Sequence, residues 1–309
     1  MINAFLTVGQ QVLILFMLLA VGFAMGKFHW LDDKGTAGIS NILLYIVTPS
    51  ILLTSFQREF VAADFRNFGL VLLVAFLLQF LLIGSSYLFI RDTDEQRRRI
   101  LRFAAIFSNC GYMGYPLMQA LVGKIGVYYG SAYVVGFTIL TWTLGVYMIS
   151  GDKNQLRLRP LLCNPGVLGT IAALALYLLQ IKLPGILMTP LEHISNLNTP
   201  LPMIVIGYQL SQADLKKAFR GISTLVTILI RLILSPLLAL GLCLLLRLHG
   251  EVAIVVMVAA STPPAAILGM FAAKYKADAS TASGIVSGVT ALSVLTMPLF
   301  VGLAQYLLG

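Results

Sequence analysis

Residues 107–116 read Phe-Ser-Asn-Cys-Gly-Tyr-Met-Gly-Tyr-Pro and lie in the middle of an apolar segment long enough to cross a lipid bilayer. Asn109, two glycines and Pro116 weaken a helix at a depth where lipid offers the backbone no hydrogen-bond partner. Irregular backbone is tolerated inside a membrane only where it faces protein or a water-filled cavity. The stretch therefore predicts a broken membrane helix whose break borders a site.

A second interruption lies in the second half of the chain, where residues 261–264 read Ser-Thr-Pro-Pro. Two successive prolines remove two backbone donors and distort a helix. A pair of interrupted apolar segments at matching positions of the two halves is the best sequence indication of a transporter's binding site. We therefore predict a membrane transporter whose substrate binds where these two breaks meet.

The composition supports this interpretation. Of the 309 residues, 59% are hydrophobic and 11% are charged, against roughly 25% charged residues in an ordinary soluble domain. The net charge of +9 comes from short loops between apolar runs and forms no contiguous basic stripe, so nucleic acid is not an expected partner. The sequence predicts an all-α integral membrane protein that contacts the lipid bilayer.

Ten apolar stretches are close to the roughly 20 residues that a spanning helix needs. They cover residues 5–26, 36–56, 67–90, 99–121, 126–149, 163–181, 188–210, 221–246, 252–274 and 280–307. Similar features recur about 150 residues apart, such as Thr48-Pro49 and Thr199-Pro200. Because five helices per repeat is an odd number, the second copy must insert upside down. We predict two inverted five-helix repeats, residues 1–155 and 156–309, although chance matching of common membrane prolines is the alternative.

The basic residues of the loops set the orientation, because cytoplasmic loops carry the excess of Lys and Arg. Loops on the side of the two termini hold five: Arg58, Arg66, Lys124, Lys182 and Arg247. The opposite loops hold fifteen: Lys27, Lys34, Arg91, Arg97, Arg98, Arg99, Arg102, Lys153, Arg157, Arg159, Lys216, Lys217, Arg220, Lys274 and Lys276. We therefore expect a multi-pass protein of the inner or plasma membrane with both termini on the extracytoplasmic side.

The charges at depth favour an anionic or neutral substrate. All twelve acidic residues fall in loops or at predicted helix ends, whereas a cation carrier ordinarily keeps a carboxylate near a helix centre. Arg231 is the one full charge placed deep, ~16 Å along its predicted helix at 1.5 Å per residue. An intramembrane arginine is by default a functional hypothesis. Its two interpretations are contact with a substrate carboxylate and capping of carbonyls freed at a broken helix.

Asn109 is the leading candidate for substrate binding. If the helix unwinds there, the half-helix that follows aims free N–H groups and its positive end at the gap, which suits an anion. Hydrogen bonding between helices is the alternative role of a membrane asparagine. Further candidates for substrate contact are Ser108, Cys110, Gly111, Thr262, Pro263, Pro264, Tyr133 and Thr138. Candidates for a hinge, with a plain kink as the alternative, are Gly114, Pro116, Pro49 and Pro200.

Enzyme signatures are missing from the sequence. It has no glycine-rich phosphate loop ahead of a lysine, no His-Glu-x-x-His and no paired cysteine motif. The three histidines are scattered and form no metal set: His29, His193 and His249. The sequence therefore predicts neither an enzyme nor an ATP-driven pump, and no cofactor or metal.

The motifs around the first break resemble the auxin efflux carrier family, which includes bacterial malate and malonate permeases and the plant PIN-formed auxin exporters. The resemblance rests on residues 108–117 (Ser-Asn-x-Gly-x-Met-Gly-x-Pro-Leu), 126–129 (Gly-Val-Tyr-Tyr), 142–145 (Trp-Thr-Leu-Gly), 47–56 (Val-Thr-Pro-Ser-Ile-Leu-Leu-Thr-Ser-Phe), Pro263 and 271–275 (Phe-Ala-Ala-Lys-Tyr). It runs across essentially the whole chain in order.

This resemblance implies an elevator-type carrier. The first, second, sixth and seventh helices would form a scaffold that also makes a homodimer, while helices three to five and eight to ten would form the moving transport domain. The fourth and ninth helices would cross at their breaks, with Asn109 near the substrate carboxylate. Two departures stand out: Ser108 replaces the proline of plant members, and neither Val134 nor Thr138 is the asparagine of bacterial relatives.

The sequence thus predicts a secondary carrier or uniporter for small organic anions, such as mono- or dicarboxylates or auxin-like acids, that exports them by alternating access. A sodium- or proton-coupled symporter of the bile-acid carrier type is the alternative among carriers, and the lack of a central carboxylate counts against it. An ion channel is the alternative from another class, and electrophysiology would distinguish it.

Overall fold

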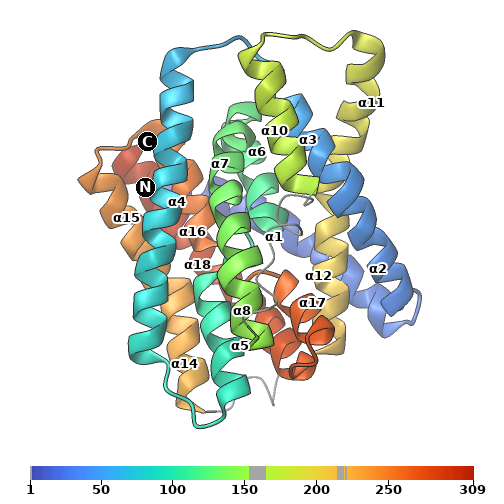
Figure 1. Cartoon of the computed structure of the whole chain (residues 1–309), viewed down its shortest axis with the longest axis vertical. Helices are drawn as coiled ribbons and strands as arrows, with labels where there is room; N and C mark the ends of the chain where they lie inside the picture. The colour runs from blue at the N-terminus through green and yellow to red at the C-terminus, as the bar shows by residue number, and fades with distance from the viewer. Residues whose placement is uncertain (1, 153–164, 214–218, 220) are drawn as a thin grey trace.

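The computed structural model describes residues 2–152, 165–213, 219 and 221–309, and the regular structure in these ranges is helical (Figure 1). The first half of the chain contains α-helices, with π-helical turns named η1, η2 and η3. They are α1 (Ile2–Lys27), α2 (Asp33–Ile42), η1 (Leu43–Val47), α3 (Thr48–Phe56), α4 (Ala62–Phe89), α5 (Glu95–Ile106), η2 (Cys110–Gly114), α6 (Tyr115–Val122), α7 (Lys124–Leu140), η3 (Thr141–Gly145) and α8 (Val146–Ser150).

The second half contains the 3₁₀ turn η5, the π-helical turn η6 and further α-helices. They are α10 (Pro165–Leu178), α11 (Gly185–Ser195), η5 (Asn196–Asn198), α12 (Pro200–Gln212), α14 (Ile222–Leu229), η6 (Ile230–Leu234), α15 (Ser235–Leu245), α16 (Gly250–Ser261), α17 (Ile267–Lys274) and α18 (Ala279–Leu308). The predicted repeat boundary at 155/156 lies outside the described residues, as do positions 163 and 164 of one predicted helix.

Six helical stretches within the described ranges are long and apolar enough to cross a membrane: Val8–Lys27, Asp33–Phe56, Ala62–Phe89, Lys124–Ser150, Ile222–Leu245 and Ala279–Leu308. Each overlaps one predicted helix. The predicted helices 163–181 and 188–210 correspond to shorter helical segments, and 99–121 and 252–274 are interrupted. The all-helical membrane fold is therefore confirmed, while ten crossings in two inverted repeats stay a prediction.

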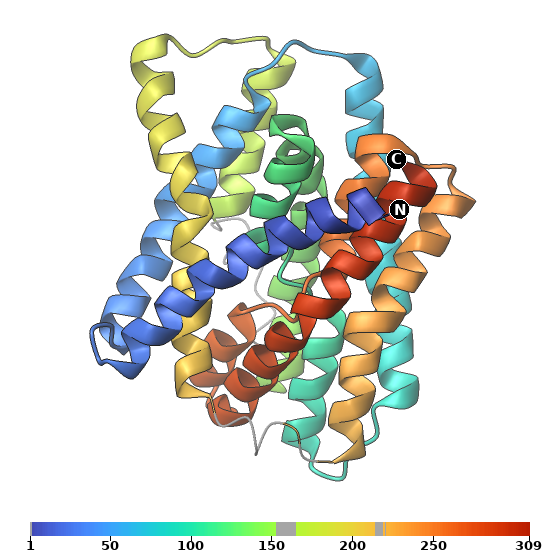
Figure 2. The same cartoon turned by 180° about the vertical axis from the view of Figure 1, so that it is seen from behind.

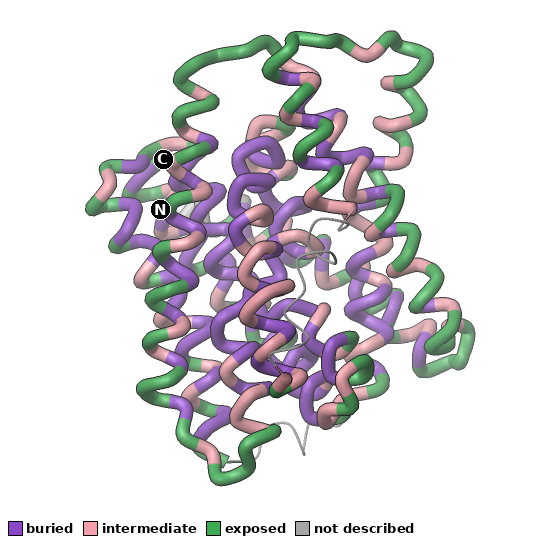
Figure 3. Tube along the Cα trace, in the orientation of Figure 1, coloured by how far each residue is buried: buried purple, intermediate pink, exposed green. Residues whose placement is uncertain are grey.

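The exterior of the molecule is apolar, as lipid requires. Figure 3 shows exposed residues along the outward sides of the peripheral helices. They include Phe80 on α4, which is 57% exposed, and Leu295 on α18, which is 73% exposed. A soluble protein rarely shows large contiguous apolar patches. Helix α16 lies inside instead, and its residues 255–260 are fully buried.

Three of the π-helical turns end two residues before a proline. η1 precedes Pro49 in α3, η2 precedes Pro116 in α6 and η6 precedes Pro236 in α15. A proline inside a helix lacks its N–H, and its ring clashes with the carbonyl four residues earlier. The wider π turn moves that carbonyl away and lets the helix continue. Proline placement therefore explains where these helices deviate from α geometry.

Helices α1 and α12 approach each other closely, and Figure 2 shows α1 running diagonally across α12 toward α18. Two glycines permit the approach. A Cβ at Gly22 would lie 2.1 Å from the carbonyl oxygen of Ile204, and one at Gly207 would lie 2.0 Å from that of Leu19. Small residues at such positions let membrane helices pack backbone to backbone.

We expect Gly22→Ala to destabilise the protein by about 1–3 kcal/mol, because the added methyl group would overpack the α1–α12 contact. Gly9→Ala is the matched control on the same helix, since no atom lies within 4 Å of a Cβ at Gly9. Thermal unfolding of the purified proteins in detergent measures both. Equal melting temperatures for the two variants would refute the close approach.

Candidate functional site

The two predicted interruptions lie side by side in the structure. α5 ends at Ile106 and α16 ends at Ser261, and the segments that follow form an isolated antiparallel bridge between Ser108 and Pro264. The N–H of Asn109 donates to the carbonyl oxygen of Pro263 at 2.8 Å, and the N–H of Ala265 donates to that of Phe107 at 2.9 Å. We call this bridged pair, residues 107–111 and 261–266, the crossover.

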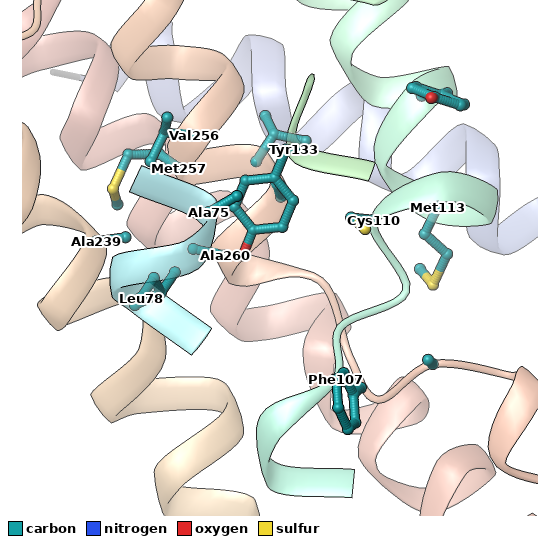
Figure 4. Packing of buried hydrophobic residues seen from close by; sticks show 14 of the residues in the cluster. Ala75, Leu78, Phe107, Cys110, Met113, Tyr133, Ala239, Val256, Met257 and Ala260 are labelled. Carbon is teal, nitrogen blue, oxygen red and sulfur yellow. The ribbon is translucent and has the colours of Figure 1, made fainter. Parts of the chain in front are cut away.

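Figure 4 shows the crossover from close by. The chain between Phe107 and Cys110 runs beside the segment that follows Ala260, and the Tyr133 ring of α7 points its hydroxyl toward that segment. Phe107, Cys110, Tyr133 and Ala260 are each at most 1% exposed. Two interruptions far apart in the sequence therefore meet in the core of the protein.

The two prolines explain why α16 ends where it does. In a continuing helix, the N–H groups at 263 and 264 would donate to the carbonyls of Ala259 and Ala260, and proline has no N–H. Side chains replace both missing donors. The hydroxyl of Thr262 donates to the Ala259 carbonyl at 2.8 Å, and the hydroxyl of Ser235 donates to the Ala260 carbonyl at 3.0 Å.

Arg231 joins the ends of both broken helices. Its Nη1 donates to the carbonyl oxygens of Ala105 and Ile106 at 3.3 and 3.1 Å, and its Nη2 donates to that of Ala260 at 2.6 Å and to the Ser235 hydroxyl. The side chain is fully buried. The contacts therefore favour the capping interpretation of Arg231 over direct contact with a substrate.

The positive charge of Arg231 nevertheless contributes to the electrostatic character of the site. No acidic side chain is among the buried residues of the described chain, and no ion pair there includes Arg231. Its guanidinium sits at the carbonyl ends of α5 and α16, which carry the negative ends of their helix dipoles. The half-helices that start at Cys110 and Ile267 present positive N-terminal ends to the same region. The crossover is consequently electropositive.

Several polar groups at the crossover lack partners. Asn109 is 5% exposed, and its side-chain Nδ2 has no hydrogen-bond acceptor among the described residues. The hydroxyl of the buried Ser261 is equally unpartnered. A Cβ built at Gly111 meets no atom within 4 Å, so there is open space beside that residue. Because unpaired buried donors are costly, this combination fits a place where a ligand completes the hydrogen bonding.

The structure gathers most of the predicted site residues. Ser108, Asn109, Cys110, Gly111, Thr262, Pro263 and Pro264 belong to the crossover. Tyr133 joins them from α7, because its side chain and that of Cys110 both interact with Ser108. Thr138 is buried on the same helix, and no hydrogen bond in the described part of the chain links its side chain to the crossover.

The predicted hinge residues divide between the crossover and the surrounding helices. A Cβ at Gly114 would lie 3.9 Å from the Thr262 methyl group, so Gly114 borders the crossover. Pro116 lies in the first turn of α6, and Pro200 begins α12. Pro49 packs against Gly169 of α10. The structure describes one arrangement of these residues, so hinge motion stays a prediction.

Two cavities lie beside the crossover helices. One of about 180 Å³ is lined by Pro116, Gln119 and Thr199, and another of about 230 Å³ is lined by Gln119, Lys124 and Glu192. Lys124 and Glu192 form an ion pair at 2.8 Å across the second. The first cavity lies between α1, α6 and η5, and the second lies between α3, α6, α7, α11 and η5. Their lining residues come from distant segments, which is why hydropathy alone did not single them out.

Ser235 and Ser261 are site residues that the sequence analysis missed. Ser235 follows Arg231 by four residues, a spacing that places two side chains on one helix face. That spacing was visible in the sequence. Ser261 immediately precedes the predicted break and was quoted only as part of it.

Comparisons with known proteins place the chain among membrane transporters. The model of a family described as "Membrane transport protein" matches residues 7–301. A protein of Methanothermobacter thermautotrophicus described as an uncharacterized transporter is 26% identical over 298 residues, which cover 94% of this chain and 96% of that protein. A protein of Methanocaldococcus jannaschii with the same description is 25% identical over 299 residues, with the same coverage.

Proposed function

The chain belongs to the membrane transport protein family, and we propose that it is a secondary carrier that moves small organic anions across the membrane without changing them chemically. The family is consistent with the resemblance to auxin efflux carriers and is not an enzyme family. The observation that carries the proposal is the electropositive crossover with its unpaired Asn109 amide and open space at Gly111.

A carboxylate matches this environment. Its two oxygens are acceptors only, and the crossover offers donors from Asn109, Ser261 and the first turn of η2. Arg231 adds a positive charge that no carboxylate of the described residues neutralises. Its Nη1 and Nη2 are already hydrogen-bonded, and only its Nε has no acceptor. Mono- or dicarboxylates and auxin-like acids are therefore the proposed substrates.

The packing is compatible with alternating access by an elevator motion. α1 packs on α12, and α3 packs on α10 and α11, which would form the scaffold. α4 packs on α7, while α16 packs on α15 and α18, which would form the transport domain carrying the crossover. The two cavities lie between these groups. A homodimer through the scaffold, and a plasma-membrane orientation with both termini outside, belong to the same proposal.

The transport mode can be tested in proteoliposomes. The membrane potential alone can drive export, because one charge crossing 100 mV corresponds to about 2.3 kcal/mol. For a monovalent carboxylate, an imposed potential of ~60 mV should change the equilibrium distribution about tenfold. The measurement is the flux of a panel of labelled organic acids under potassium diffusion potentials set with valinomycin.

Two outcomes would contradict the proposal. Flux that ignores the voltage and requires a sodium or proton gradient would favour the coupled symporter. Currents that never saturate with substrate and show no exchange would favour a channel. Saturation together with exchange of internal for external carboxylate is the expected carrier behaviour.

A further inference from the structure

A second electropositive pocket lies far from the crossover, at the end of the molecule where α5 begins. Its volume is about 190 Å³, and its lining includes Tyr87 of α4, Arg98, Arg99 and Arg102 of α5, and Tyr147 of α8. Neither the transport proposal nor the family assigns this pocket a role. Its charge and position point to a ligand of its own.

Two of the three arginines have no carboxylate partner. Arg99 forms an ion pair with Glu95, and Arg97, outside the pocket, pairs with Asp92. Arg98 donates from Nη1 to the carbonyl oxygen of Asp92 at 2.9 Å, and no ion pair among the described residues includes Arg98. The net charge along the lining is therefore positive.

Arg102 is the deepest of the three. Its Nη2 donates to the carbonyl oxygen of Ile90 at 3.1 Å, and its guanidinium lies 4.1 Å from the centroid of the Tyr87 ring. The described residues offer it no ion-pair partner, and its buried Nε has no acceptor. A guanidinium held in this way can present its remaining donors to a phosphate, for which its planar fork is suited.

The surroundings favour a lipid over a soluble anion. The pocket lies at the boundary between the apolar helix α4 and the basic loop that the charge distribution predicts to be cytoplasmic. On α4, Tyr87, Leu88 and Phe89 are 48%, 57% and 55% exposed, so apolar surface for acyl chains adjoins the arginines. Basic pockets between membrane helices on the cytoplasmic side typically bind anionic lipid headgroups.

We propose that an anionic phospholipid binds here, with its phosphate between Arg98 and Arg102 and its acyl chains along the end of α4. The site lies on helices assigned to the proposed transport domain, but the inference does not depend on the transported substrate. Phosphatidylglycerol is the probe, phosphatidylcholine is the zwitterionic comparison, and glycerol 3-phosphate tests the headgroup without acyl chains.

The test is thermal unfolding of the delipidated protein in detergent during titration with each probe. Phosphatidylglycerol should raise the melting temperature, whereas phosphatidylcholine and glycerol 3-phosphate should not at equal concentration. Arg98→Gln should weaken the apparent affinity for phosphatidylglycerol about fivefold, as expected for one basic residue at a membrane surface. Lys34→Gln, which removes one charge from the first turn of α2 on the same predicted side, should leave that affinity unchanged.

Equal stabilisation by phosphatidylglycerol and phosphatidylcholine would overturn the proposal. So would an Arg98→Gln variant that responds to phosphatidylglycerol as the parent protein does. Full stabilisation by glycerol 3-phosphate would also overturn it, because it would indicate a soluble anion as the ligand. Native mass spectrometry of the parent protein gives a test that needs no variant. Retention of phosphatidylglycerol but not phosphatidylcholine is expected there, and equal retention would also refute the site.

Discussion

Asn109→Ala is expected to lower carboxylate transport by about 10- to 100-fold while leaving the melting temperature nearly unchanged. The loss corresponds to about 1.5–3 kcal/mol for one hydrogen bond to a charged group. The fold should survive, because the Asn109 side-chain amide donates no hydrogen bond in the described structure and the bridge to Pro263 uses its backbone N–H. Flux in proteoliposomes and thermal unfolding in detergent measure the two effects separately.

Asn198→Ala is the matched control for this substitution. Asn198 is 2% exposed, and its Nδ2 also lacks an acceptor among the described residues, but it belongs to η5 and not to the crossover. Transport by the control should remain within about twofold of the parent. Unchanged transport by Asn109→Ala would remove this residue from the proposed site, and equal losses in both variants would show that any buried cavity impairs the carrier.

The positions of the two helix breaks were predictable because their causes are local. Glycine and proline act on their own helix, so residues 107–116 and 261–264 mark interruptions whatever surrounds them. The sequence predicted that the two breaks meet, but not that Ser108 pairs with Pro264. This pairing joins segments more than 150 residues apart, and its register depends on how α5 and α16 pack.

Two helices begin several residues earlier in the chain than predicted, because their N-capping residues lie outside the apolar run. The range 99–121 was placed by hydropathy, but α5 begins at Glu95, where the Asp94 side chain accepts from the N–H groups of Gln96 and Arg97. Asp32 caps α2 in the same way ahead of the predicted start at 36. These signals were available in the sequence, because aspartate is a preferred N-cap.

The role of Arg231 shows what the sequence could not decide. Spacing along the helix put the residue near the middle of the membrane, and that depth is compatible with both interpretations. The direction of its side chain depends on η6 and on the neighbouring helices, which only the fold defines. Its partners are carbonyls that the prolines and the first break leave without N–H donors.

Arg231→Met is expected to destabilise the protein by about 3–5 kcal/mol, the usual cost of breaking a buried charged network. Methionine fills a similar volume but donates nothing, so the carbonyls of Ala105 and Ile106 would be left buried and unpaired. Ala260 would retain only the Ser235 hydroxyl. The measurement is the melting temperature in detergent, together with the yield of monodisperse protein.

Arg231→Lys separates the capping role from a substrate role. Lysine keeps the charge but is a single donor centre on a flexible stem, and it cannot reach both helix ends as the planar guanidinium does. If Arg231 acts as a cap, Arg231→Lys should also lower the melting temperature, and its remaining folded fraction should bind substrate with little change in KM. A variant of normal stability whose KM rises more than tenfold would instead assign Arg231 to the substrate carboxylate. Because the same side chain joins α5 to α16 beside the backbone bridge of the crossover, the stability measurement also shows how much Arg231 adds to that bridge.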